Sequence, residues 1–191
     1  MYKENIDVIL YYPFFFLVYN NNKKLGRLCF YTILSGLSLY EFIDKEMYYF
    51  HYNDLNEYNY VGNKCRILAI QYFLTDIFFL NNKSILFHHI LMLIAMTWSY
   101  ILNNGYCLAI YLSLNEISSM FLGLKNLNIF PKYSNICFMI SFFVFRILLL
   151  PILTYIYSYN NFIFIALLID NCLHYYWVIN LYKKNANKLL N

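Results

Sequence analysis

Long apolar runs, separated by short polar segments, follow one another along almost the whole chain. A membrane-spanning helix needs about 20 mostly apolar residues, and these runs approach that length when they include flanking Asn and Tyr residues. The first run is short and contains Pro13, which favours a kink. The predicted fold class is all-α, a multi-pass transmembrane helical bundle of about seven spans. The predicted spans are Ile6–Tyr19, Leu28–Ile43, Ile67–Leu80, Ile85–Leu102, Tyr106–Leu122, Ser134–Ile156 and Phe162–Leu181.

The segment from Tyr72 to His89, YFLTDIFFLNNKSILFHH, places an acid and two histidines on opposite sides of a short polar turn. A turn this short makes the flanking helices antiparallel neighbours. Asp76 lies about six residues before the centre of the turn and the histidines, His88 and His89, about six after it, so a rise of about 1.5 Å per residue brings them to nearly the same membrane depth. Because a charge inside the bilayer costs at least ~2.5 kcal/mol, this grouping indicates a functional site.

Three later spans add further polar side chains that the bilayer disfavours. Two of them, in the seventh span, lie one helical turn apart and therefore share a helix face. Together with the acid and the histidine pair, they can nearly neutralise one another in a shared cavity near the midplane or in the cytosolic half. The added candidates are Glu116, Ser118 and Ser119 in the fifth span, Arg146 in the sixth, and Asp170 and His174 in the seventh.

Each candidate also has a structural interpretation. Arg146 can form an ion pair with Asp170 or Glu116, and His174 can be a hydrogen-bonded core histidine. The histidine pair can lie near the headgroups at the membrane edge, and the two serines can be helix-packing hydroxyls. An opposed acid at matched depth favours the functional interpretation for the histidine pair.

The composition is that of a membrane protein. Hydrophobic residues make up 61% of the 191 residues and charged residues 13%, compared with about 25% charged residues in soluble domains. The net charge is +4, but the positive residues lie in inter-helix loops rather than on one basic face, which argues against nucleic acid as a partner.

Metal and disulfide chemistry have little support in the sequence. The five cysteines lack zinc-binding spacing, and the four histidines lack the HxxxH and HxxHH boxes of diiron membrane enzymes. No metal and no bound cofactor are therefore expected. Cys65 and Cys107 fall near the same predicted membrane face, and the sequence leaves open whether they form a disulfide.

The distribution of charge predicts the orientation of the chain. Basic residues without acidic neighbours follow the first span, occupy the central turn, follow the fifth span and form the C-terminal tail, which places these segments in the cytosol. Acids gather in the opposite loops, where Lys45, Lys64 and Arg66 are outnumbered. The N-terminus is therefore predicted to be lumenal and the C-terminus cytosolic. The basic tail is either an ordinary stop-transfer flank or a contact for anionic lipid headgroups.

The order of these motifs resembles the TLC domain, a family that joins translocation-associated membrane proteins, ceramide synthases and the ceroid-lipofuscinosis membrane protein. The resemblance is closest to the small TLC-domain-containing proteins. It divides the chain into a first helix with a basic turn (1–24), the TLC domain (25–184) and a short tail (185–191). It rests on YxxxD ending at Asp76, the pair His88-His89, ExSS at 116–119, R-x-x-x-x-P from Arg146 to Pro151, and a polar last helix ending in Trp177.

This resemblance implies six core helices plus a leading one, enclosing a lipid-accessible cavity in the endoplasmic reticulum or a related membrane. It also implies a role in membrane lipid metabolism or lipid composition. In ceramide synthases the histidine pair and nearby acids catalyse N-acylation of a sphingoid base by acyl-CoA. His88 and His89 match that pair, and Glu116 falls at the later aspartate of an HDxxD element. Leu112 and Ser113 replace the preceding His-Asp of that element.

Two functions of different classes follow. In the first, the protein transfers an acyl group from acyl-CoA to a lipid amine or hydroxyl. His88 or His89 acts as base or acyl acceptor, Asp76 orients it and Glu116 assists. In the second, the protein is a non-catalytic lipid-sensing, trafficking or cargo-binding protein that uses the same cavity. A small transporter fits less well because the sequence lacks an inverted repeat. Membrane lipids are the expected partners, and a homo-oligomer is left open.

Overall fold

The structure, a computed structural model, describes residue 13 and residues 16–44, 60–102, 106–158 and 161–189. Within these ranges it contains helices and no strand, which confirms the all-α prediction. The first predicted span, Ile6–Tyr19, lies largely outside the described residues. The helices are α2 (Lys23–Asp44), α3 (Tyr60–Ile77), α4 (Lys83–Ile101), α5 (Tyr106–Leu114), α6 (Glu116–Asn126), α7 (Pro131–Ser141), the π-helix η3 (Phe142–Leu149), α8 (Leu150–Ile156) and α9 (Asn161–Leu189).

Among the described residues, three helical stretches are long and apolar enough to cross a membrane: Lys83–Ile101, Pro131–Ile156 and Asn161–Asn180. The second joins α7, η3 and α8 into one continuous rod. α2 and α3, with 22 and 18 residues, also have the length of a span, but they carry more polar side chains. Their polar groups are largely turned inward, because Ser35, Ser38, Glu41, Asn63, Arg66, Thr75 and Asp76 are buried.

Large apolar side chains lie on the outside of the bundle. Phe78, Tyr155 and Ile140 are 60% or more exposed, while the histidines and most acids of the described spans are buried. In water this distribution would be unfavourable, but in a bilayer the apolar side chains meet lipid tails and the polar ones meet each other. The bundle is therefore that of an integral membrane protein.

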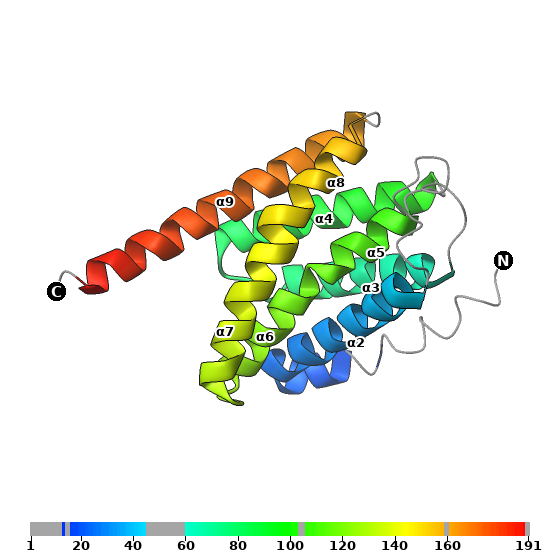
Figure 1. Cartoon of the computed structure of the whole chain (residues 1–191). Coiled ribbons are helices and arrows are strands. Elements are labelled where there is room, and N and C mark those ends of the chain that lie inside the picture. The colour runs from blue at the N-terminus through cyan, green and yellow to red at the C-terminus, as the bar shows by residue number, and fades with distance from the viewer. Residues whose placement is uncertain (1–12, 14–15, 45–59, 103–105, 159–160, 190–191) are drawn as a thin grey trace.

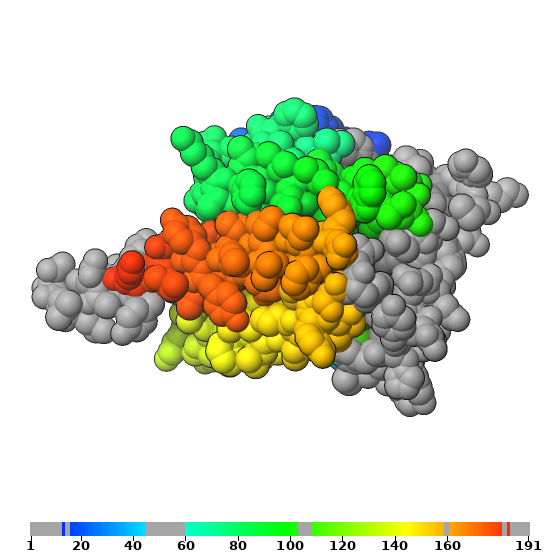
Figure 2. Space-filling view, turned by 90° about the horizontal axis from the view of Figure 1, so that it is seen from above, coloured from blue at the N-terminus to red at the C-terminus, as the bar shows by residue number. Residues whose placement is uncertain are grey.

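Helices distant in the chain pack together as extensively as many consecutive ones, and the last helix packs on α4. α3 lies against α4 and α5, α2 against α5 and α6, and α6 against α7. Seen from above, α9 lies between α4 and the rod of α7, η3 and α8 (Figure 2). The C-terminal end of α9 extends beyond the other helices, where it diverges from α7 (Figure 1).

The predicted fifth span, Tyr106–Leu122, is interrupted in the structure. α5 ends at Leu114 and α6 begins at Glu116, with Asn115 in a tightened turn between them. The Asn115 N–H donates to the Leu112 carbonyl, and the Ser118 N–H donates to the Asn115 carbonyl, both at 3.2 Å. These three-residue bonds are of the 3₁₀ type and shift the helix phase. The break places Asn115 and Glu116, two adjacent polar residues, at the buried centre of the bundle.

The sixth span is continuous but changes register. Residues 142–149 form a π-helix, and the α-helix resumes at Leu150, just before Pro151. Proline has no N–H and cannot donate to the Ile147 carbonyl, so an irregular register just before it is favoured. Wide π turns recur at functional sites, and this one carries the buried Arg146.

The turn that precedes α4 is fixed by Asn82. Its Oδ1 atom accepts hydrogen bonds from the Ser84 N–H at 3.0 Å and the Ile85 N–H at 3.4 Å, which caps the N-terminus of α4. The helix therefore begins at a defined residue, and the two histidines follow in its second turn. α3 and α4 pack against each other as the sequence predicts for helices joined by this short turn.

Candidate functional site

The two adjacent histidines of α4 contact different acids. His88 Nδ1 lies 2.6 Å from Asp170 Oδ1, and Asp170 comes from α9, 82 residues further along the chain. Both residues are buried. Because a carboxylate only accepts hydrogen bonds, Nδ1 of His88 carries the hydrogen and its Nε2 is the atom available to a ligand. We call this contact the His88–Asp170 pair.

His89 lies beside Asp76 of α3. His89 Nδ1 is 3.1 Å from Asp76 Oδ2, while Arg27 Nη2 of α2 is 2.7 Å from Asp76 Oδ1. Arg27 Nε also donates to Asp76 Oδ1 and to the Tyr19 hydroxyl, each at 2.9 Å. Asp76 is only 1% exposed, whereas Arg27 is partly exposed at the edge of the bundle.

Two tyrosines extend this network from Asp76. The Tyr72 hydroxyl donates to Asp76 Oδ2 at 3.3 Å, and the Tyr31 hydroxyl lies 2.6 Å from the Tyr72 hydroxyl. The Phe30 and Tyr72 rings stack with centroids 4.0 Å apart, which fixes the Tyr72 ring. We call His89, Asp76, Arg27, Tyr72 and Tyr31 together the His89 cluster.

Arg146 joins the broken fifth span to the last helix. Its Nε donates to Ser118 Oγ at 2.8 Å, its Nη2 donates to Ser119 Oγ at 2.8 Å, and its Nη1 lies 2.7 Å from His174 Nε2. Nη2 also donates to the Asn115 carbonyl at 3.3 Å. This bond helps to satisfy a backbone carbonyl at the break between α5 and α6.

The tautomer of His174 follows from these contacts. A guanidinium only donates, so Nε2 of His174 accepts from Arg146 and the ring hydrogen lies on Nδ1. That Nδ1 donates to the Asp170 backbone carbonyl at 2.8 Å and lies 3.6 Å from Asp170 Oδ2. Asp170 thus faces two histidine rings, whose centroids are 5.7 Å apart.

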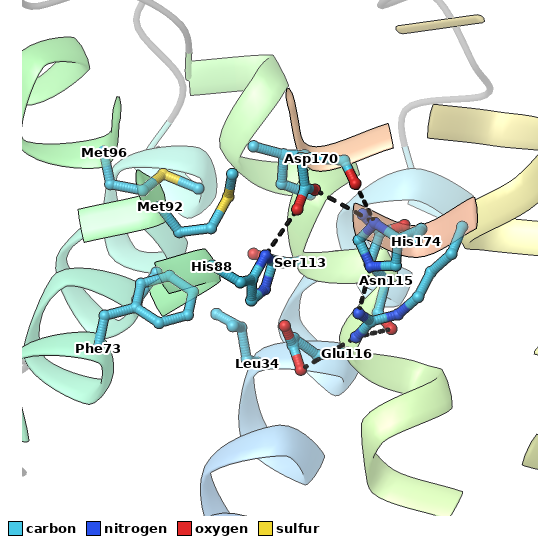
Figure 3. A pocket seen from close by; sticks show the side chains of 13 residues that line it. Leu34, Phe73, His88, Met92, Met96, Ser113, Asn115, Glu116, Asp170 and His174 are labelled. Carbon is cyan, nitrogen blue, oxygen red and sulfur yellow. Dashed lines mark hydrogen bonds and ion pairs between the residues drawn. The ribbon is translucent and has the colours of Figure 1, made fainter. Parts of the chain in front are cut away.

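Two pockets lie side by side, and His88, Glu116 and Arg146 line both of them. The smaller, the inner pocket, has a volume of about 20 Å³ and is lined by His88, Asp170, His174, Glu116 and Arg146 together with apolar side chains such as Met92 and Phe73. Figure 3 shows the His88 ring with its Nδ1 toward Asp170, and the Glu116 carboxylate facing the same pocket. Glu116 Oε2 is 3.8 Å from Arg146 Nη2.

The larger pocket, the main cavity, has a volume of about 880 Å³. This is the size of a site for a large organic ligand, for which volumes of about 300–1,000 Å³ are usual. Its wall combines His88, His89 and Arg146 with a mostly apolar lining from α7, η3 and α9, while α6 contributes mainly polar side chains. One end reaches the turn Asn82–Ser84, where Trp177 Nε1 donates to Ser84 Oγ at 3.2 Å.

All of the sequence-predicted candidates except Asp76 line one or both of these pockets, and Asp76 lies beside His89. Asp76 and His89 meet as their matched depth predicts, but the carboxylate beside His88 is that of Asp170. Arg146 contacts Glu116 and not the Asp170 side chain, within the ion-pair distances of the described residues. Ser118 and Ser119 both accept from Arg146, and Glu116 lines both pockets. Their roles in a reaction stay predictions.

Sequence reasoning missed Tyr31 and Tyr72 as part of the site and used Arg27 only to predict orientation. Tyr72 and Asp76 are four residues apart, so their shared helix face was a usable signal. Tyr31 is one of 22 tyrosines, and nothing in its local sequence separates it from the others.

The remaining predictions on metal and cysteine concern other parts of the chain. Among the described residues, no group of three or more His, Cys, Asp or Glu side chains has the geometry to hold a metal ion. Cys65 is a buried free thiol, and the side chain of Cys107 lies outside the described residues.

Comparison with known proteins gives one positive finding. The sequence model of the TLC domain family matches residues 20–183, which is most of the chain. No curated protein and no solved structure matches the chain significantly. The matched region contains α2 to α8 and most of α9, and with them the three candidate histidines, the three candidate acids and Arg146. The chain belongs to the TLC domain family and is an integral membrane protein of the lipid-related kind that this domain indicates.

Proposed function

We propose that this protein transfers an acyl group from an acyl-CoA to the amine or hydroxyl of a membrane lipid. The observation that carries the proposal is the His88–Asp170 pair, in which a 2.6 Å contact orients a histidine that lines an 880 Å³ cavity. A histidine held by a carboxylate at Nδ1 presents Nε2 as a base or a nucleophile. The apolar wall of the cavity suits acyl and lipid chains, and its polar residues gather around the same ring.

His88 has two possible roles in this reaction. As a base, Nε2 takes the proton of the lipid amine or hydroxyl while that nitrogen or oxygen attacks the thioester carbonyl and the thiolate leaves. As an acyl acceptor, Nε2 attacks the carbonyl first, and the C–S bond breaks to release the CoA thiolate. The lipid nitrogen or oxygen then attacks the acyl carbon, the bond between that carbon and Nε2 breaks, and the freed Nε2 takes the lipid's proton. In both routes Asp170 stabilises the positive charge that develops on the imidazole. Asp170 therefore takes the orienting role for His88 in this proposal.

The other polar residues of the cavity have supporting roles. Arg146 donates to Ser119 Oγ, and among the described residues no acceptor takes the hydroxyl hydrogen of Ser119, which lines the main cavity. That hydroxyl is therefore available as a donor to a carbonyl oxygen of a ligand. Ser118 differs, because its hydroxyl already donates to the Asn115 carbonyl. Glu116 assists by balancing the charge of Arg146.

The proposal includes the location and orientation of the protein. The main cavity reaches the turn Asn82–Ser84, which carries Lys83 without acidic neighbours and is assigned to the cytosol by its charge. Acyl-CoA, which is water-soluble at its nucleotide end, would then reach the cavity from the cytosol. We place the protein in the endoplasmic reticulum or a related membrane. Tagging each terminus and testing antibody access in selectively permeabilised cells would check both statements.

The direct test is product formation by purified protein in lipid nanodiscs. Labelled acyl-CoA is supplied with a panel of sphingoid and glycerolipid acceptors, to the parent protein, to His88→Ala, and to a Cys137→Ser control whose half-buried thiol lies on α7 outside the cavity lining. Labelled lipid from the parent and the control, and none from His88→Ala, supports acyl transfer at this site. No product from any acceptor, with the protein folded, would replace the enzyme by a non-catalytic lipid-binding protein.

A further inference from the structure

The hydroxyl chain of the His89 cluster has a fixed direction. Asp76 is held by Arg27 at 2.7 Å and is a carboxylate, which accepts hydrogen bonds and donates none. The Tyr72 hydroxyl therefore donates its one hydrogen to Asp76 Oδ2. Its oxygen is left to accept, so in the 2.6 Å contact between the two tyrosines Tyr31 is the donor. Each hydroxyl in the chain thus points its hydrogen toward Asp76.

The end of this chain lies at the main cavity. Tyr31 lines that cavity, and its only hydroxyl hydrogen is committed to Tyr72. What Tyr31 offers a ligand is therefore the lone pair of its oxygen. Hydrogen bonds in a chain polarise one another, and the negative charge of Asp76 lies at the far end of this one. The Tyr31 oxygen is thus an acceptor that favours a donor with positive charge.

We propose that Tyr31 forms a subsite for the N–H or O–H group of the lipid, and that this subsite favours a protonated primary amine. Tyr72 and Asp76 are positioning residues, because they fix the direction of the Tyr31 hydroxyl without meeting the ligand. The proposal deepens the proposed function, since it names the chemistry by which the acyl-accepting lipid is held. The bound ammonium gives one proton to water before its nitrogen attacks, and Nε2 of His88 takes the second proton in the transfer step. His89 lines the same cavity and shares Asp76, so the lipid head would lie beside the histidine pair.

The subsite discriminates between ligands that charge alone does not separate. A long-chain primary amine and its N,N,N-trimethyl analogue are both cations with the same apolar chain, but only the amine has N–H groups. A hydrogen bond that involves a charged group contributes enough that its loss weakens binding by about tenfold or more. An ionised fatty acid is disfavoured at the same place, because its oxygens would face the Tyr31 lone pair.

The experiment measures binding of these two cationic probes to the full-length protein in lipid nanodiscs, without any turnover. Tyr31→Phe removes the hydroxyl and keeps the ring. The matched control is Tyr133→Phe, an exposed tyrosine of α7 outside both the cavity lining and the His89 cluster. We expect the parent and the control to bind the amine about tenfold more tightly than the trimethyl analogue, and Tyr31→Phe to bind the two about equally.

A second variant tests the direction of the chain. In Tyr72→Phe the Tyr31 hydroxyl hydrogen is freed and the hydroxyl can turn to donate, so the preference for the amine should fall while the affinity for the trimethyl analogue stays unchanged. Equal binding of the two probes by the parent overturns the subsite. A Tyr31→Phe variant that keeps the parent's preference does so too, and an unchanged preference in Tyr72→Phe overturns the role of Tyr72.

These outcomes are separate from those of the acyl-transfer test. If the amine preference depends on Tyr31 but the protein forms no acylated lipid, the subsite is supported and the proposed acyl transfer is overturned. If the protein forms acylated lipid but binds the two probes equally, the proposed acyl transfer is supported and the Tyr31 subsite is overturned.

Discussion

His88 and His89 are neighbours in the chain, yet each contacts a different acid from a different helix. His88 has one close acid, Asp170 of α9, and its ring lines both pockets. His89 shares its acid, Asp76, with Arg27 and Tyr72 from the α2–α3 side. Successive residues on an α-helix are turned by about 100°, so a histidine pair necessarily faces two different sets of neighbours.

Because their acids differ in this way, we expect His88 and His89 to have different roles. The carboxylate of Asp170 is directed at two histidines and is not engaged by Arg146 at ion-pair distance, so it can stabilise positive charge on His88. The carboxylate of Asp76 already pairs with the Arg27 guanidinium, and its oxygens face three partners. The His88–Asp170 pair is therefore suited to chemistry, and the His89 cluster to holding the lipid and the bundle.

The largest expected effect is on acyl transfer when each histidine is replaced in turn. His88→Ala should lower the initial rate by about 10³-fold, within the usual range for a general base, because the other ring beside Asp170, that of His174, has its Nε2 engaged by Arg146. His89→Ala should lower the rate about tenfold, through looser binding of the lipid. Initial rates with labelled acyl-CoA in nanodiscs measure both. Equal losses in the two variants would contradict the division of roles.

The next effect concerns the two acids. Asp170→Asn keeps the size of the side chain but no longer fixes the hydrogen on Nδ1 of His88 or balances an imidazolium, so the rate should fall about 10²-fold or more. Asp76→Asn should act mainly on the affinity for the lipid amine, since Asn still accepts from Tyr72 but lacks the charge. Varying acyl-CoA and amine concentrations separately distinguishes the two. A rate that depends on Asp76 more than on Asp170 would reverse the assignment.

Parts of this arrangement were predictable from sequence. Asp76 and His89 meet because a short turn forces α3 and α4 to be antiparallel and both residues lie about six positions from its centre. The family and the all-α bundle followed from the order of polar motifs within apolar runs. The adjacent polar residues at 115 and 116 were a sequence signal for the break between α5 and α6. The apolar run around them is long enough for one span, so the sequence predicted an uninterrupted helix there.

Other parts depend on how distant helices cross. The contact between His88 and Asp170 joins residues 82 positions apart, and only the packing of α9 on α4 decides that Asp170 faces His88 while Arg146 takes the far side of His174. The π-helical register that carries Arg146 changes which face of the sixth span it occupies, and no hydrophobic pattern reports that change. Tyr31 joins the His89 cluster through its contact with Tyr72 and also lines the main cavity.

A smaller effect, on stability rather than on rate, is expected at Arg27. Arg27→Gln leaves the buried Asp76 carboxylate without its cation, which should lower the free energy of unfolding by about 3 kcal/mol. Lys83→Gln, at an exposed position in the turn, is the control for loss of a positive charge and should have little effect. The midpoint of thermal denaturation in detergent reports both. An unchanged midpoint in Arg27→Gln would show that the His89 cluster does not hold the bundle.

The smallest effect is expected at Trp177, whose ring lies beside the rings of His88 and His174. Its ring lies 5.6 Å from the His88 ring and 5.0 Å from that of His174, and its Nε1 donates to Ser84 Oγ at the end of the cavity. Trp177→Phe keeps an aromatic ring beside His88 but loses the hydrogen bond, a change of about 1 kcal/mol. The acyl-transfer rate should fall by no more than about tenfold, and the affinity for the amine probe at Tyr31 should not change. A loss of amine preference in this variant would mean that the two histidines share one site and that their different acids do not separate their roles.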